Sequence, residues 1–356
     1  MFCSVITGTG SCIPSEIQTN ADFFNHAFYT DNGHRLDIPS PEVVEKFRKL
    51  TGISSRRYAS SGITASDLAT AAAAAAIQTS GINPETIDQI IVAHNFGDIK
   101  KDSVQTDATP SLASRVKYKL GINNPNCIPY DILFGCPGWL QGVIQADAFL
   151  KAGLAKKCLV IGAETLSRVI DLYDRDSMIF GDGAGACIVE LQDLTKTKGI
   201  LSSSTENHVG EMLQFINMDK TSNPTENQSL RYIKMKGRKV YDYAMQHVPQ
   251  VMKECLDKSG LSIDEVKKIF IHQANEKMDQ HIVKAFYKLY DKTVTTEDIM
   301  PMSIQWLGNS SVATIPTLLD LVLKNQVPNH TLKNGDLIMF ASIGAGMNVN
   351  AMCYRY

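Results

Sequence analysis

Residues 80–92 read SGINPETIDQIIV and residues 259–271 read SGLSIDEVKKIFI, and the two segments align without a gap. Each copy contains a Ser-Gly pair typical of a helix end, then an acidic turn, then a β-branched run that predicts a strand. A looser match relates residues 139–162 to residues 311–341, each of which predicts a helix followed by a strand. One such match arises easily by chance, but two in the same order favour a duplicated fold.

The strands and helices predicted around these repeats alternate along the chain, which indicates an α/β protein. Residues 66–79, SDLATAAAAAAIQT, predict a capped helix whose small side chains suit burial between layers. We expect two halves, 1–195 and 196–356, joined within the polar segment 191–200, and a polar excursion over residues 206–230. Buried strands are predicted at Val5–Gly8, Ile90–Ala93, Cys158–Gly162, Ala186–Glu190, Ile269–His272 and Leu337–Ala341.

The composition argues against several classes of protein. The 356 residues are 44% hydrophobic, which is enough for a large core. A formal charge of −2, from 35 Lys and Arg against 37 Asp and Glu, provides no overall field for nucleic acid or an anionic membrane. The eight cysteines show no C-x-x-C pair or metal-ligand spacing, so we expect a reducing compartment, no metal and no cofactor. Without a basic leader or a run of about 20 apolar residues, the chain is predicted to be cytoplasmic.

Cys136 differs from the other thiols in its sequence context. In residues 132–140, ILFGCPGWL, a predicted strand passes through a tight turn into a helix predicted over Trp139–Leu150, and Pro137 suits a first helical turn. A thiol at a helix N-terminus meets unpaired N–H groups, and we expect the helix dipole to lower its pKa from about 8.5 toward neutrality. Cys136 is therefore the candidate nucleophile, and the alternative is a buried structural cysteine.

Three further segments carry candidate catalytic groups. His272 follows the second repeat at the carboxyl end of a strand, and its counterpart after the first repeat is Ala93, so its imidazole suggests a role in one half only. The alternative is a satisfied core histidine. Asn309 precedes a helix predicted over Ser311–Leu323 and is also a candidate capping residue. The turn 342–347, SIGAGM, can bring a backbone N–H against a thioester oxygen.

Together these segments resemble the thiolase superfamily, and most closely its ketoacyl-ACP synthase III branch. The likeness covers nearly the whole chain. Its ordered motifs are GTG at 8–10, TNAD at 19–22, LTGI at 50–53, the Cys136 turn, IFGDGAGA at 179–186, MKG at 235–237, HQAN at 272–275, GNS at 308–310 and IGAG at 343–346. Phe134, Gly135 and Pro137 replace the usual small residues, which resembles the secondary-metabolite synthases that join two acyl chains into cyclohexanediones or dialkylresorcinols.

The resemblance implies a five-layered αβαβα fold, a homodimer and a triad of Cys136, His272 and Asn309. In such an enzyme the cysteine carries an acyl group, and the histidine and asparagine hold the oxygen of a second thioester while its α-carbon becomes a carbanion. The N–H groups of Cys136 and Ala345 would form the oxyanion hole for the acyl group. The expected reaction is a Claisen condensation with an acyl, β-ketoacyl or malonyl thioester on acyl carrier protein, in fatty-acid-like or secondary metabolism.

Two features of the motifs exclude neighbouring families by resemblance. The turn 343–346 has no second cysteine, which argues against a degradative thiolase. Asn309 stands where the elongating synthases have a second histidine. Members primed by acyl-CoA often have a tryptophan where this chain has Lys46, and Arg175, the counterpart of a CoA-contacting arginine, lies one residue closer to the 180–182 motif than usual.

Other departures concern the acyl chain and its carrier. Thr109 stands where short-chain members have a bulky aromatic residue, so we expect Thr109 and Phe134 to line a deeper acyl pocket. Lys277 occupies the position of a family arginine that meets acyl carrier protein. Lys284 lies seven residues further, on the same helix face, and we expect both to contact the acidic carrier. The alternative is an ordinary solvated helix face.

Two other functions stay open. A condensation like that of 3-hydroxy-3-methylglutaryl-CoA synthase needs a glutamate acid upstream of the cysteine, and the comparable loop Asn95–Thr106 offers only Asp98 and Asp102. A catalytically silent partner subunit that sets chain length would not need an intact Cys-His-Asn set.

Overall fold

Two sheets with matching strand orders form the framework of the fold. The computed structural model describes residues 2–193 and 198–356. The first sheet has the strand order β1-β7-β6-β4-β5, and the second has the order β8-β13-β12-β11. The strands are β1 (Phe2–Cys12), β4 (Gln89–Ala93), β5 (Ile128–Ile132), β6 (Lys157–Thr165), β7 (Asp182–Asp193), β8 (Gly199–Asn207), β11 (Val266–Ile271), β12 (Leu337–Gly344) and β13 (Asn348–Arg355).

The pairing directions repeat as well. β7 is antiparallel to β1 and β6, and β6 is parallel to β4. In the second sheet β13 is antiparallel to β8 and β12, and β12 is parallel to β11. The first sheet has one additional strand, β5, beside β4. The sheet formed within residues 198–356 has no corresponding strand beside β11.

The two sequence repeats occupy equivalent places in this pattern. The helices α2 (Ala65–Ser80) and α5 (Gly237–Ser259) end at Gly81 and Gly260, whose φ angles are 70° and 69°, and β4 and β11 follow. A left-handed C-cap favours glycine because it has no Cβ. The predicted duplication is therefore confirmed. The predicted division between residues 195 and 196 lies outside the described residues and stays a prediction.

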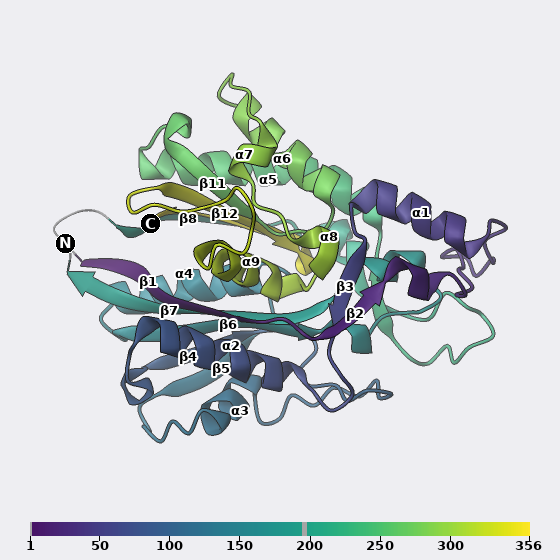
Figure 1. The fold of residues 1–356 in the computed structure, drawn as a ribbon, viewed down its shortest axis with the longest axis horizontal. Helices are drawn as coiled ribbons and strands as arrows, with labels where there is room; N and C mark the ends of the chain where they lie inside the picture. The colour runs from purple at the N-terminus through teal and green to yellow at the C-terminus, as the bar shows by residue number, and fades with distance from the viewer. Residues whose placement is uncertain (1, 194–197) are drawn as a thin grey trace.

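Helices cover both faces of each sheet and give five layers (Figure 1). α2 and α3 (Leu112–Lys119) cover the outer face of the first sheet, and α5 and α6 (Glu276–Lys288) cover that of the second. Between the sheets lie α4 (Gly138–Lys151) and α9 (Thr314–Leu323), where Trp139 and Leu318 share one core cluster with Phe340 of β12. The αβαβα order expected from the sequence is confirmed.

The alanine-rich helix α2 packs unusually close to β1. A Cβ at Gly8 would lie 2.4 Å from the carbonyl oxygen of Ala76, and one at Gly10 would lie 2.3 Å from that of Ala72. The close approach of α2 to β1 therefore depends on both the glycines of the strand and the alanines of the helix. The predicted burial between layers is wrong, because α2 is an outer layer: Ala72 and Ala73 are buried against the first sheet, whereas Ala71 and Ala74 are exposed.

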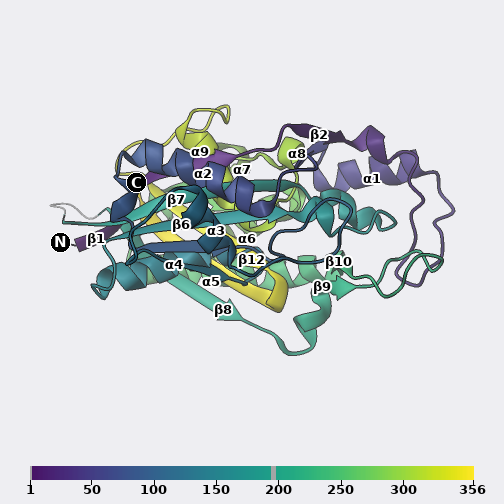
Figure 2. The same cartoon turned by 90° about the horizontal axis from the view of Figure 1, so that it is seen from below.

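The smaller elements gather at the end of the molecule opposite the termini (Figures 1 and 2). Two antiparallel pairs lie there: β2 (Glu16–Thr19) with β3 (Ser55–Tyr58), and β9 (Ile216–Asp219) with β10 (Tyr232–Met235). The remaining helices are α1 (Ser40–Thr51), α7 (Thr296–Ile299) and α8 (Ile304–Leu307). Within residues 2–193 and 198–356, no helix has the length and apolarity needed to cross a bilayer.

Candidate active site

The predicted catalytic residues lie in turns after strands or between helices, in both halves of the fold. Cys136 lies in the turn between β5 and α4, and Asn309 lies between α8 and α9. His272 directly follows β11, and its N–H donates to the carbonyl of Ala341 in β12 (2.8 Å). Ala345 directly follows β12, four residues after Ala341, which pairs with Ile271 of β11.

Two turns face each other at the thiol. A Cβ at Gly344 would lie 2.4 Å from the amide nitrogen of Cys136, and a Cβ at Gly135, whose φ is 66°, would lie 2.6 Å from that of Ala345. The two N–H groups proposed as an oxyanion hole therefore belong to backbone segments in van der Waals contact. Asn348 joins these turns, because its Nδ2 donates to the carbonyl oxygens of Ala345 (3.0 Å) and Phe134 (3.4 Å).

The ionisation of Cys136 differs from the sequence-based prediction. Burial raises the pKa of its thiol to about 11, and the charge of Glu164 acts in the same direction, while a hydrogen bond from Ser311 opposes them. Helix α4 begins at Gly138 with Pro137 as its cap, so Cys136 precedes the helix instead of lying in its first turn. The expected pKa near neutrality is thus wrong, because desolvation outweighs the helix dipole.

A chain of polar side chains leads away from the thiol. Ser311 Oγ donates to Cys136 Sγ (3.3 Å), and Asn95 Nδ2 donates to Ser311 Oγ (3.1 Å) and to Glu164 Oε1 (2.5 Å). Glu164 is 1% exposed, and its burial raises the pKa of its carboxyl to about 8. Ser311 itself has a φ of 52°, a conformation that is costly outside glycine and that tends to occur at functional sites.

Sequence reasoning missed Ser311, Asn95 and Glu164. A signal was present for Glu164, since it stands at the carboxyl end of the predicted strand 158–162, where α/β folds place their sites. Ser311 and Asn95 carry no such signal, because they meet only when segments 216 residues apart come together.

His272 is held as a neutral imidazole. It is 3% exposed, and burial lowers the pKa of the ring to about 4. Its Nδ1 is buried with no hydrogen-bond partner among the described residues. The neighbouring Gln273 fixes the segment, because its side chain donates to Pro301 and accepts from the N–H groups of Ser303 and Ile304.

Asn309 is not the cap considered from the sequence, because α9 begins at Thr314 with Ala313 as its cap, but it is fixed at the site. Its Oδ1 accepts from the N–H of Ser311 (2.8 Å), and its backbone bonds to Ile179 and Gly181 on the 179–186 motif. With the carbonyl oxygen of the amide committed to the backbone, the NH₂ group is left as the donor available to a ligand.

A cavity of about 850 Å³ lies beside the segment that follows His272, and Ala274, Asn275, Lys277 and Met278 line it. Four further cations line it, Arg175, Lys236, Arg238 and Lys239. Lys284 is exposed on α6, the helix that also carries Lys277, but it does not line the cavity. Local hydrogen bonds lower the pKa of Glu297 in α7, and the charge of Lys284 adds to that effect. Of the two predicted carrier-binding lysines, only Lys277 therefore lines the cavity.

The other predicted positions are placed as follows. Thr109 is exposed in the loop before α3, and Phe134 is partly buried beside the Cys136 turn. Lys46 forms an ion pair with Glu42 on the surface of α1 (2.8 Å). Asp98 accepts from Ser66 and Arg115, so its carboxylate is committed to structure, and Asp102 is exposed.

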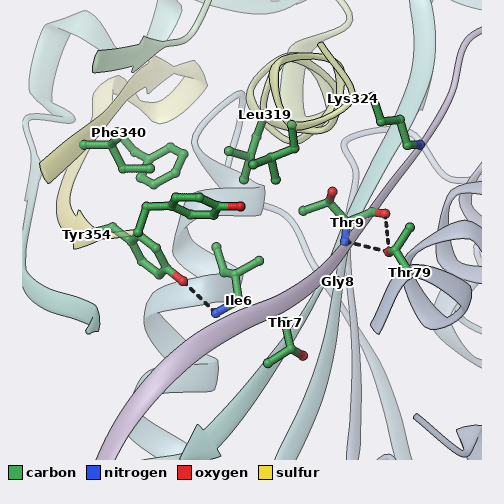
Figure 3. A pocket seen from close by; sticks show the side chains of 12 residues that line it. Ile6, Thr7, Gly8, Thr9, Thr79, Leu319, Lys324, Phe340 and Tyr354 are labelled. Carbon is green, nitrogen blue, oxygen red and sulfur yellow. Dashed lines mark hydrogen bonds between the residues drawn. The ribbon is translucent and has the colours of Figure 1, made fainter. Parts of the chain in front are cut away.

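A smaller cavity of about 220 Å³ lies between β1, α9 and the second sheet (Figure 3). Its wall includes Ile6, Leu319, Phe340 and Tyr354, and the Tyr354 hydroxyl accepts from the N–H of Ile6. Its cation, Lys324, is paired with the buried Asp320 (2.7 Å). This cavity shares no lining residue with the Cys136 site.

The chain is similar to known proteins over its whole length. Two family models match the chain, 3-oxoacyl-[acyl-carrier-protein] synthase III over residues 130–208 and its C-terminal model over residues 256–356. A β-ketoacyl-[acyl-carrier-protein] synthase III from Erythrobacter litoralis is 32% identical, with the whole of both chains covered. The structure of 3-oxoacyl-[acyl-carrier-protein] synthase III from Aquifex aeolicus has a TM-score of 0.79 at 30% identity, covering 99% of this chain and 100% of that one.

A priming β-ketosynthase from the R1128 polyketide pathway has a TM-score of 0.80 at 25% identity, covering 99% of this chain and 96% of that one.

Proposed function

Because this chain belongs to the 3-oxoacyl-[acyl-carrier-protein] synthase III family, we propose that its ketosynthase reaction, a Claisen condensation between acyl thioesters, takes place at Cys136 with His272 and Asn309. The observation that carries the proposal is the contact between the Gly135–Cys136 and Gly344–Ala345 turns. That contact supports an oxyanion hole formed by the backbone N–H groups of Cys136 and Ala345.

In the first half-reaction, Cys136 Sγ attacks the carbonyl carbon of an acyl thioester. The oxyanion accepts hydrogen bonds from the N–H groups of Cys136 and Ala345, and the carrier's C–S bond then breaks. The proton of the Cys136 thiol ends on the departing thiol, so no net charge is created. A high thiol pKa is compatible with this exchange, because the proton needs to leave only as the S–C bond forms.

In the second half-reaction, His272 and Asn309 donate hydrogen bonds to the carbonyl oxygen of the second thioester. Loss of CO₂ from a malonyl group makes that oxygen an enolate. The enolate carbon attacks the acyl carbon on Cys136, the C–S bond breaks, and the Cys136 thiolate that leaves takes up a proton from solvent. A neutral imidazole suits this role, because its N–H donates a hydrogen bond to the enolate oxygen and the ring carries no additional proton to transfer to it.

The cavity of about 850 Å³ is the proposed route of the thioester arm. Five cations line it, Lys277, Arg175, Lys236, Arg238 and Lys239, and they outnumber the three lining carboxylates of Asp31, Asp174 and Asp176. This excess of positive charge would attract the phosphate of a pantetheine arm and the acidic surface of an acyl carrier protein. These groups support carrier protein as the donor. Lys46, in an ion pair on α1, offers no stacking surface for adenine.

A homodimer is the proposed assembly. β5 is an edge strand of the first sheet, and an edge with unpaired N–H and C=O groups is a template for pairing with another chain. Apolar side chains are exposed beside it, Ile128 at 49% and Leu133 at 68%. Thr109 is exposed in the same half, as expected of a residue that lines the partner's acyl pocket with Phe134. Membership of the dialkylresorcinol-forming subgroup stays a prediction.

The test measures acylation of Cys136. Wild-type protein and Cys136→Ala are incubated with acyl thioesters of increasing chain length, and intact-protein mass spectrometry measures the acyl adduct. The wild type is expected to gain one acyl group, and the variant none while its thermal midpoint is retained. A variant that is still acylated would refute the assignment. Condensation is then measured with a malonyl thioester, and a wild type that loads without condensing would favour the silent partner subunit.

A further inference from the structure

A second group of chemically reactive side chains lies outside the site described above. Glu206 and His208 lie at the end of β8, the edge strand of the second sheet, and His247 lies on α5, which packs against β8 (Figure 2). Residues two apart on an extended segment project to the same side, so Glu206 and His208 share a face. One ligand atom from each of the three residues lies within 4.8 Å of the others.

We infer that Glu206, His208 and His247 form a binding site for a divalent transition metal ion of the zinc class, with a coordination position open to solvent. Two nitrogens and one carboxylate oxygen are a donor set typical of such ions. All three side chains are partly exposed, Glu206 at 34% and His208 at 33%, so an ion can reach them.

The spacing suits direct ligation. Glu206 Oε2 lies 3.5 Å from His208 Nε2. Two ligand atoms bound about 2.0–2.1 Å from a tetrahedral zinc ion lie roughly 3.3 Å apart. The rings of His208 and His247 have centroids 4.3 Å apart, so a small rotation brings the third donor to the same point.

Tyr243 contacts Nδ1 of His208, so Nε2 is the ring nitrogen that faces Glu206. The Tyr243 hydroxyl donates its single proton to the carbonyl oxygen of Met347 (3.0 Å) and lies 2.7 Å from His208 Nδ1. In the tautomer with its hydrogen on Nδ1, that N–H donates to the phenol oxygen, and the lone pair of the neutral ring is on Nε2, facing Glu206. A cation between this lone pair and the carboxylate oxygen would satisfy both acceptors.

That cation is either a proton on Nε2 or a metal ion. A proton would satisfy His208 and Glu206 alone, whereas a metal ion also engages His247. Tyr243 stacks on His247 with centroids 4.3 Å apart and bonds to His208, so one side chain orients both imidazoles. Such an outer partner of a histidine ligand fixes its tautomer and orientation in metal sites.

The site is tied to the oxyanion turn. The N–H of His208 donates to Met347 O (3.2 Å), and Asn207 Nδ2 donates to Gly346 O (2.8 Å). A bound ion would therefore fix the end of β8 against the turn that carries Ala345. This inference departs from the expectation of no metal, which rested on cysteine spacing and could not detect a site of histidine and glutamate.

The test is a titration of the chelator-treated full chain with Zn²⁺ by calorimetry and with Co²⁺ by visible absorption. We expect one zinc per chain and a Co²⁺ spectrum without a thiolate charge-transfer band. His247→Ala is expected to weaken binding at least 100-fold, and Tyr243→Phe roughly 10- to 100-fold. The isosteric Glu206→Gln keeps the test valid if His247→Ala does not fold, and it should weaken binding at least tenfold.

His34→Ala, which removes an exposed histidine before α1, is the matched control and should bind zinc as the wild type does. Three outcomes would overturn the inference. The first is the absence of zinc binding at millimolar concentration, which would leave a protonated His208 paired with Glu206. The second is unchanged binding in both His247→Ala and Glu206→Gln. A thiolate band in the Co²⁺ spectrum would assign the metal to a cysteine.

Discussion

Ser311 Oγ donates a hydrogen bond to Cys136 Sγ over 3.3 Å, and the two residues come from opposite halves of the duplicated fold. The bond favours the thiolate and opposes the effect of burial on the thiol. The first half of the chain thus supplies the proposed nucleophile, and the second supplies a donor that assists its ionisation.

Ser311→Ala should therefore slow acyl loading without abolishing it. A single neutral hydrogen bond contributes about 1 kcal/mol, which corresponds to a rate lower by roughly fivefold. Stopped-flow measurement of the first acylation checks this, with Ser310→Ala at the adjacent position as the matched control. Equal slowing in both variants would mean that the turn, and not the hydroxyl, is responsible.

Glu164 is expected to control the pH dependence of the thiol. Its pKa is about 8, so its carboxyl is mostly neutral near pH 7 and negatively charged above about pH 9. The negative charge raises the pKa of Cys136, so ionisation of Glu164 holds back the thiolate as the pH rises. Glu164→Gln should match the wild type in iodoacetamide alkylation near neutral pH and react roughly threefold faster above about pH 9.

The rate of alkylation of Cys136, followed by peptide mass spectrometry over this pH range, provides the measurement. Cys136→Ala reports the background from the other thiols. If the two pH profiles coincide above the pKa of Glu164, its carboxylate does not act on the thiol.

The fold was predictable from the sequence because its determinants are local. Helix ends at Gly81 and Gly260, and the β-branched runs after them, occur within single segments, and their repetition indicated the duplication. The site was predictable in part. Cys136, His272 and Asn309 stand in recognisable turns, whereas the group of Asn95, Glu164 and Ser311 depends on contacts between distant segments.

The thiol pKa was wrongly predicted for a related reason. A helix start can be read from Pro137 and Gly138, but the burial that dominates the pKa of Cys136 comes from the whole fold. Likewise, the metal-ligand spacing between Glu206 and His247 exists only once α5 packs on β8.

His272→Ala should separate the two half-reactions. Its imidazole is neutral and, by the proposal, donates only to the second thioester, so acyl loading on Cys136 should persist. Condensation should fall by about two or more orders of magnitude, as it does on loss of one oxyanion donor elsewhere. Mass spectrometry measures the acyl adduct, and release of CO₂ or product measures condensation. A parallel fall in both rates would show that His272 activates the thiol.

The last prediction distinguishes the two lysines of α6. Lys277 lines the large cavity together with four other cations, whereas Lys284, two turns further along the helix, lies where its charge acts on Glu297. A charge at the cavity should steer an acidic carrier protein more strongly than one outside it, since such attraction is screened over about 10 Å. Lys277→Glu should therefore lower kcat/KM for a carrier-bound substrate by roughly tenfold at low salt. Lys284→Glu, the matched charge reversal, should lower it less, and neither variant should affect the reaction of a short thioester without a carrier.

Added salt should reduce the difference in kcat/KM between the wild type and Lys277→Glu. Equal losses in the two variants would indicate a diffuse field over α6, and an equal loss with the short thioester would mean that Lys277 supports the site itself and does not contact the carrier.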